Sequence, residues 1–259
     1  MQNPGFKFLL SFLFKSSIIV MFLIIEVNAQ TVDEIIAKNL KARGGIEKIK
    51  AIKTQRIVGD ISFGSGKANP FMVEMKRPGK MKDEIIINGK RIIRTTNGKT
   101  GWVLNPFSGS DTARPMTADE LKNTAGSADI DGPLLDYKAK GNKIEFAGKD
   151  KINGKDAFKL IVTMKDGDVR DDYIDCKSFL EVKWVGNIST NGKAVKVETY
   201  FSKYKKIDGL MYAFLLQTDT PGTTSTQKIE IKKVNVNSQL DDQLFEKSGL
   251  YVVDYKDAK

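Results

Sequence analysis

The sequence predicts an α+β fold that is mostly β, built as a single curved antiparallel sheet with few helices. The tripeptide Asn-Gly-Lys occurs four times, at Asn88, Asn97, Asn153 and Asn191, and Asn-Gly between alternating segments is a strong hairpin signal because both residues tolerate positive φ. The segments between these turns alternate apolar and polar side chains, as half-buried strands do. No linker rich in Pro or Ser divides residues 30–259, so they are expected to form one domain.

Residues 1–29 have the features of a signal peptide. The first fifteen residues hold two lysines and no acid, residues 16–25 (SSIIVMFLII) are a short apolar run, and Val27-Asn28-Ala29 offers small residues for cleavage before Gln30. The run is shorter than a spanning helix needs, although an uncleaved anchor is the alternative. No Cys follows the cleavage site. We therefore expect a soluble periplasmic protein without a lipid anchor.

The composition limits the possible functions. The chain has a formal net charge of +10 and no histidine, which removes the usual general base of hydrolases and the commonest ligand of catalytic zinc. No set of nucleophile, base and orienting residue stands out, so we expect no catalytic residues, no metal and no cofactor. For a basic exported protein, lipid head groups or acidic protein surfaces are more plausible partners than nucleic acid; a well-solvated surface is the plain alternative. Cys176 is the only cysteine, so no internal disulfide can form. We also expect the protein to be a monomer.

The first element after the predicted cleavage site is a helix. Thr31 and Glu34 form a capping box, Val32 and Leu40 mark the apolar spacing, and Gly44-Gly45 ends the helix. Strands are then predicted, with Gly64-Ser65-Gly66 and Asp166-Gly167 as further turns, over residues 54–63, 69–77, 80–88, 90–97, 99–104, 143–152, 156–165, 168–175, 180–189, 193–203, 210–219 and 226–236. Strands adjacent in sequence are expected to pair.

Residues 105–141 interrupt the series of strands. A second capping box, Thr117 with Glu120, opens a short helix through about Thr124, and Leu134-Leu135 are apolar within an otherwise polar loop. Excursions of this length inside a domain are usually lids or binding elements.

Two segments resemble ligand-binding motifs but lack the required residues or spacing. Gly64-Ser65-Gly66-Lys67 lacks the length and the following Ser or Thr of a phosphate loop. The acidic residues between Asp166 and Asp175 lack calcium-loop spacing, so we interpret them as a solvated hairpin.

The predicted strands share one apolar face. Such a face is most often an ordinary packed core, but a curved sheet with helices as a cover can instead enclose an apolar cavity. The sequence pattern leaves both open.

The segments 76–81 (KRPGKM) and 97–107 (NGKTGWVLNPF) resemble the periplasmic carriers of the LolA-like family, which sort outer-membrane lipoproteins. Residues 240–245 (LDDQLF) are similar to the closing segment of that family. The resemblance implies a half-open β-barrel with helices forming a lid over an apolar cavity that receives acyl chains. It also implies that Arg77 is a lid latch, reaching from the barrel to backbone carbonyls of the lid. The geometry agrees, since Arg77 continues the inward row of Phe71, Val73 and Met75.

The apolar rows and the resemblance together predict the lining of a lipid-binding cavity: Ile57, Ile61, Phe71, Val73, Met75, Met81, Ile85, Ile87, Trp102, Leu104, Leu121, Leu134, Leu135, Phe158, Leu160, Val162, Tyr212 and Phe214. The predicted function is transport of acylated lipoprotein or another lipid toward the outer membrane, with an inner-membrane export complex and an outer-membrane acceptor as further partners. The alternative is a non-enzymatic envelope interaction module with a filled β core and a basic docking surface.

Overall fold

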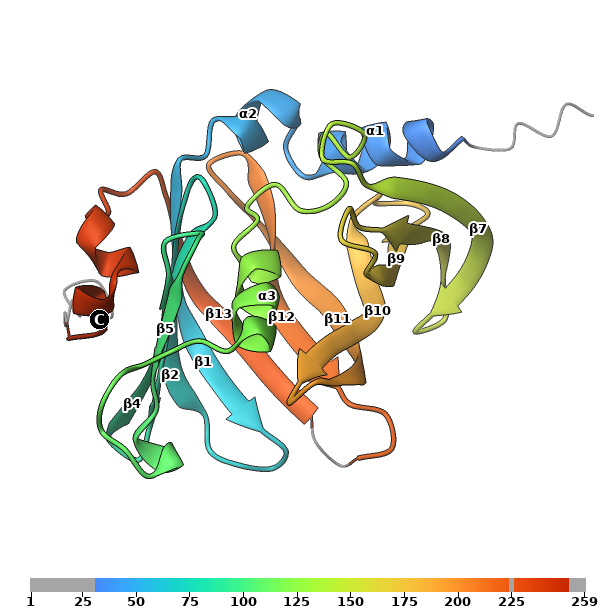
Figure 1. Cartoon of the computed structure of the whole chain (residues 1–259). Coiled ribbons are helices and arrows are strands. Elements are labelled where there is room, and N and C mark those ends of the chain that lie inside the picture. Colours follow the sequence, from blue (N-terminus) through green and yellow to red (C-terminus); the bar gives the residue numbers. More distant parts are fainter. Residues whose placement is uncertain (1–30, 224–225, 252–259) are drawn as a thin grey trace, which may run out of the picture.

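The computed structural model describes residues 31–223 and 226–251, and its main feature is one antiparallel sheet of 13 strands (Figure 1). The predicted signal peptide and residues 252–259 lie outside the described residues. The strands are β1 Thr54–Phe63, β2 Asn69–Lys76, β3 Lys80–Ile87, β4 Lys90–Thr96, β5 Gly101–Leu104, β6 Arg114–Pro115, β7 Lys143–Ile152, β8 Lys155–Thr163, β9 Val169–Asp175, β10 Glu181–Thr190, β11 Lys193–Ile207, β12 Leu210–Asp219 and β13 Thr226–Val236. The helices are α1 Val32–Ala42, α2 Ile46–Lys50 and α3 Ala118–Ser127, with 3-10 turns η1 Pro106–Ser108, η2 Asp242–Phe245 and η3 Lys247–Tyr251.

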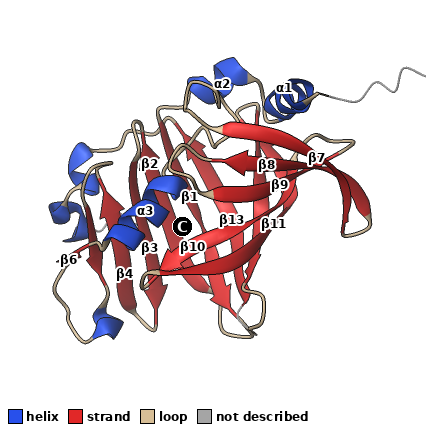
Figure 2. Cartoon of the chain, turned by 45° about the vertical axis from the view of Figure 1, so that its right-hand side comes forward, coloured by secondary structure: helices blue, strands red, loops and turns tan. Residues whose placement is uncertain are grey.

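The sheet consists of two meanders joined at their ends. Strands β1 to β6 pair in sequence order, as do β7 to β13, and β1 pairs with β13 at the centre. The sheet is strongly curved, so that one face is concave (the hollow of the sheet), and β6 and β7 are its two edge strands (Figure 2). The predicted curved antiparallel sheet, mostly β with few helices, is confirmed.

Turn chemistry explains the meander. Asn88, Asn153 and Asn191 have positive φ and each precedes a glycine of positive φ, the conformation that suits the twist of a two-residue hairpin. Asn97 behaves differently, because its side-chain Oδ1 accepts hydrogen bonds of 3.0 Å from the backbone N–H groups of Lys99 and Thr100. The turn at Asn97-Gly98 is therefore a loop closed by a side chain.

The N-terminal region contains the predicted helix and one helix more. The capping box of α1 forms as expected, but a second helix, α2, begins directly after Gly45. The reason lies at Gly44, which has a φ of +128° and lies so close to the β11–β12 hairpin that a Cβ would meet the Gly209 carbonyl oxygen at 2.6 Å. The glycine pair therefore ends α1, as predicted, and turns the chain across that hairpin into α2.

Helices lie within and above the hollow of the sheet. α1, α2 and the loop after α3 cover its upper end, and α3 stands inside it (Figures 1 and 2). α3 is tied to β10 by Asn123, whose Nδ2 donates to the Ser189 carbonyl at 2.7 Å. On the other side, a Cβ at Gly101 of β5 would lie 2.3 Å from Met116 Sδ and 3.2 Å from Leu121 Cδ1. α3 thus bridges the two meanders.

The outer face of β3–β5 is covered as well. Leu240, Leu244 and Phe245 form a small buried cluster at η2, and the Thr95 hydroxyl donates to the Leu244 carbonyl at 3.1 Å. Both faces of this part of the sheet are therefore buried. Among the helices of residues 31–223 and 226–251, none is long and apolar enough to cross a membrane.

Candidate functional site

A cavity of about 450 Å³ lies between the concave face of the sheet and the helical cover. Its apolar wall comes from both meanders and includes Ile57, Met75, Phe201, Leu216 and Ile231. Its cover includes Ile130 and Leu134 from the loop after α3. The volume falls in the range of small-molecule sites, about 300–1,000 Å³.

Four of the residues predicted from the sequence line this cavity: Ile57, Met75, Leu134 and Tyr212. Val73 and Met81 lie beside it, in a cluster formed by Met75, Met81 and Ala128. The register of β1, β2 and β3 places four more on the same concave face but away from the cavity: Ile61, Phe71, Ile85 and Ile87.

Four of the remaining predicted lining residues belong to a packed core. Phe158, Leu160 and Val162 of β8 pack with Leu135 and with helix α1 in the largest buried cluster. Phe214 is also buried, with Lys205 Nζ 4.3 Å from its ring centroid, and Leu121 lies over Gly101. The concave face is thus partly filled and partly hollow.

The prediction that Trp102 and Leu104 line the cavity is wrong. In the register of β4 and β5, Trp102 lies opposite Thr95 and Leu104 opposite Ile93, on the face that the C-terminal segment covers. Lys247 Nζ lies 5.0 Å from the Trp102 ring centroid. Alternation identifies two faces but cannot say which is inner when both are buried, and Val103 takes the inward position.

Arg77 contacts three points of the cover. Its Nε donates to the Ile52 carbonyl at 2.6 Å, and its Nη2 donates to the Ile49 carbonyl, in α2, at 3.2 Å. Both terminal nitrogens also pair with the carboxylate of Asp131 in the loop after α3, with Nη1 at 2.6 Å from Oδ2. One side chain from the end of β2 therefore joins two separate parts of the cover.

Asp131 was not foreseen as a partner of Arg77. The paired guanidinium lowers the pKa of Asp131, with Lys140 and Arg43 as weaker contributors, and the carboxylate raises the pKa of Arg77 in return. Arg43 also holds this loop, because its Nη1 donates to the Asp131 carbonyl at 3.1 Å. The only sequence signal was a pair of acids, Asp129 and Asp131, before Gly132.

The other end of the cavity is polar. Asp172 is fully buried and Glu181 lies beside it, both facing Arg170. Burial raises the pKa of both carboxyls, that of Glu181 to about 7. The interpretation of residues 166–175 as a solvated hairpin is therefore wrong for Asp172, which lies opposite Leu160 in the β8–β9 register and so faces the inside of the sheet.

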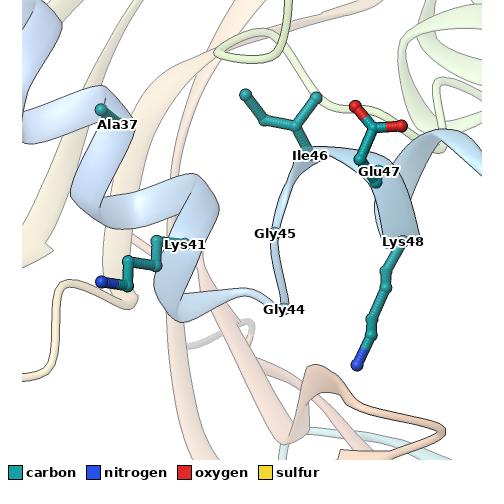
Figure 3. Close-up of a pocket in the computed structure, with 7 residues that line it drawn as sticks. All are labelled: Ala37, Lys41, Gly44, Gly45, Ile46, Glu47 and Lys48. Atoms are coloured by element: carbon teal, nitrogen blue, oxygen red, sulfur yellow. The ribbon is translucent and has the colours of Figure 1, made fainter.

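A separate depression of about 360 Å³ lies at the turn between α1 and α2 (Figure 3). Ala37 and Lys41 border it on α1, and Ile46 and Lys48 on α2. Since Lys41, Ile46 and Lys48 are exposed, it belongs to the outer surface. Across the described part of the chain, no group of three or more His, Cys, Asp or Glu side chains could hold a metal ion.

The architecture is similar to that of several solved structures, although no family model and no curated protein matches the sequence. Among solved structures, a DUF1329 family protein from Desulfovibrio piger matches with 16% identity over 85% of this chain and 99% of that one, at a TM-score of 0.60. A LolA superfamily protein from Nitrosomonas europaea matches with 13% identity over 83% and 97%, at 0.56. A Vibrio parahaemolyticus domain described as an outer membrane lipoprotein-sorting protein matches with 12% identity over 83% and 96%, at 0.57. The chain has a LolA-like fold.

Proposed function

We propose that this protein is a periplasmic carrier that binds acyl chains of lipoproteins or other lipids in its cavity and moves them toward the outer membrane. The observation that carries the proposal is a partly hollow concave sheet whose cover is tied by Arg77 at three points. The Vibrio parahaemolyticus domain of the same fold is described as lipoprotein-sorting, which supports the proposal by analogy of fold.

The cavity wall favours an apolar ligand. Side chains such as Ile57, Leu216 and Ile231 offer carbon surface from three strands, and each methylene that leaves water is worth about 0.8 kcal/mol. An acyl chain can therefore gain useful affinity from burial alone, and no catalytic step is needed to explain the site.

The cover provides a way in and out. Arg77 ties α2 and the Asp131 loop to the end of β2 through hydrogen bonds, which add to the apolar packing of Ile49 and Leu134 in the buried core. A ligand that needs more room than the cavity offers would break these contacts, and the lid would close again on release. Such a two-state lid is biased by the ligand according to the affinity difference between its states.

A filled interaction module with a basic docking surface is the competing function. Its support is the packed core of α1 and β8, which occupies one end of the concave face. The two functions differ in one measurable respect, because only a carrier must bind an acyl chain inside the sheet.

Binding of a fluorescent fatty-acyl molecule to the folded, delipidated protein separates them. We expect saturable binding of about one molecule per chain, weakened only modestly by salt because apolar burial dominates and charges are screened. Leu216→Trp should block it by filling the cavity, whereas Val169→Trp, at an exposed position of β9, is the matched control. Absence of saturable binding to the folded protein would favour the interaction module.

The location is tested separately. Because residues 16–29 have the pattern of a cleaved signal peptide, we expect N-terminal sequencing of the protein from the periplasmic fraction to begin at Gln30. A chain that keeps residue 1 in the membrane fraction would contradict the periplasmic carrier.

A further inference from the structure

The polar end of the cavity contains hydrogen-bond acceptors without donors. Asn39 of α1 lines the cavity and is 1% exposed, and its Nδ2 donates to the Phe179 carbonyl at 2.8 Å, which leaves Oδ1 as its acceptor. Asn39 Oδ1 and Glu181 Oε1 are both buried and accept no hydrogen bond from the described residues. A buried acceptor without a donor costs about 1–3 kcal/mol, so this end of the cavity favours a ligand that donates.

The charges at this end are unevenly matched. Arg170 Nε lies 2.7 Å from Asp172 Oδ1 without a hydrogen bond, and its Nη2 donates to Asp172 Oδ2 at 2.9 Å. The same guanidinium lies 3.6 Å from Glu181 Oε1 without a hydrogen bond, and the Trp184 ring, 5.5 Å from Arg170 Cζ, packs against it. One guanidinium thus serves two carboxyls and binds closely to only one.

We infer that this end of the cavity binds the ammonium head group of a single-chain amphiphile, with Glu181 and Asn39 as its acceptors and the tail along Ile57 and Leu216. The inference rests on the proposed carrier function and specifies the class of cargo. A primary ammonium supplies both the positive charge that Glu181 lacks and several N–H donors. A carboxylate head group would supply neither and would be repelled by Asp172 and Glu181.

The geometry also makes the binding depend on pH. Burial and the neighbouring Asp172 raise the pKa of Glu181 to about 7, opposed by Arg170 and by Arg43 from the end of α1. The buried Tyr204 hydroxyl of β11 donates to the Glu181 backbone carbonyl at 2.7 Å, and Asp129 faces Arg170 from the cover. Because an alkyl amine resembles lysine, with a pKa of about 10.4, it stays charged while Glu181 loses its proton. Amine binding should therefore strengthen as pH rises from 6 to 8.

The test compares four dodecyl amphiphiles below their micelle concentrations by calorimetry: the amine, the alcohol, the trimethylammonium compound and the carboxylate. The wild-type protein should bind the amine about tenfold or more tightly than the alcohol, as expected for a hydrogen bond to a charged group. The trimethylammonium compound, with charge but without donors, should be intermediate, and the carboxylate weakest.

Glu181→Gln should remove most of the amine's advantage over the alcohol and the pH dependence of that advantage. Glu145→Gln, at an exposed position of β7, is the matched control and should behave as wild type. The wild-type order of head groups and its pH slope need no variant, so poor folding of Glu181→Gln would not spoil the test. Equal binding of all four compounds would overturn this inference and leave the carrier function standing, whereas binding of none would contradict both.

Discussion

Replacing Arg77 tests whether this side chain latches the cover of the cavity. Arg77→Leu removes the hydrogen bonds to the Ile49 and Ile52 carbonyls and the paired contact with Asp131. If Arg77 were only a solvated end of β2, the substitution should change stability by less than about 0.5 kcal/mol. If Arg77 is the latch, the closed state of the lid should lose much more stability than that.

The expected magnitude follows from these contacts. Hydrogen bonds to a charged group are worth about 1.5–3 kcal/mol each when buried, but the side chain of Arg77 is 30% exposed and that of Asp131 17%, so solvent screening reduces the sum. We expect a shift of about 2–3 kcal/mol toward the open lid. A shift of that size corresponds to roughly 30-fold to 150-fold in the closed–open equilibrium.

Binding and release should respond in opposite directions. Because whatever favours the closed lid disfavours the ligand, Arg77→Leu should bind a fatty-acyl ligand more tightly and transfer it more slowly to acceptor membranes. Arg77→Lys should be intermediate at best, since an ammonium cannot reproduce the planar fork of donors. Arg91→Leu is the matched control, because Arg91 also pairs through two nitrogens with a carboxylate, Glu84, away from the cover. Unchanged binding and unchanged transfer in Arg77→Leu would refute the latch.

Three further predictions concern other parts of the site and the fold. Leu216→Trp should weaken fatty-acyl binding about tenfold or more, a loss of at least 1.4 kcal/mol, measured by probe titration; unaltered affinity would place the ligand elsewhere. The pKa of Asp131 is lowered from 3.8 in the closed protein, so its contact with Arg77 stabilises the closed lid above pH 3.8, and this stabilisation is lost as pH falls through the lowered pKa. Hydrogen exchange of α2 should therefore become faster at that low pH, and Asp131→Asn should remove this pH dependence. Phe245→Ala empties a site that is 0% exposed and should cost about 3–5 kcal/mol in urea unfolding, while fatty-acyl binding persists because Phe245 lies on the outer face.

The strands and turns could be predicted because their signals are local. Asn88-Gly89 and Asn153-Gly154 set hairpins through their own backbone preferences, and the alternation of side chains marks the strands between them. The pairing of β1 with β13 joins segments about 170 residues apart and depends on the curvature of the whole sheet, for which no short segment carries a signal.

The site was less predictable than the fold. The inward row ending at Arg77 gave the position of that guanidinium, but its partner Asp131 depends on the path of the loop after α3. Trp102 was assigned to the wrong face because the C-terminal segment buries a second face that alternation cannot distinguish. Exposure statistics favour a solvated Asp172, but its i, i+2 spacing from Arg170 on β9 puts both side chains on one face, and the fold buries that face.

The carrier function depends on an acyl chain occupying the hollow of the sheet, and native mass spectrometry measures this directly. Protein purified from an envelope extract should carry one acylated molecule per chain, and Leu216→Trp should carry none, because the indole occupies the space beside Ile231. A bare chain from the extract that also gains no mass when the folded protein is incubated with fatty-acyl ligand would contradict the account.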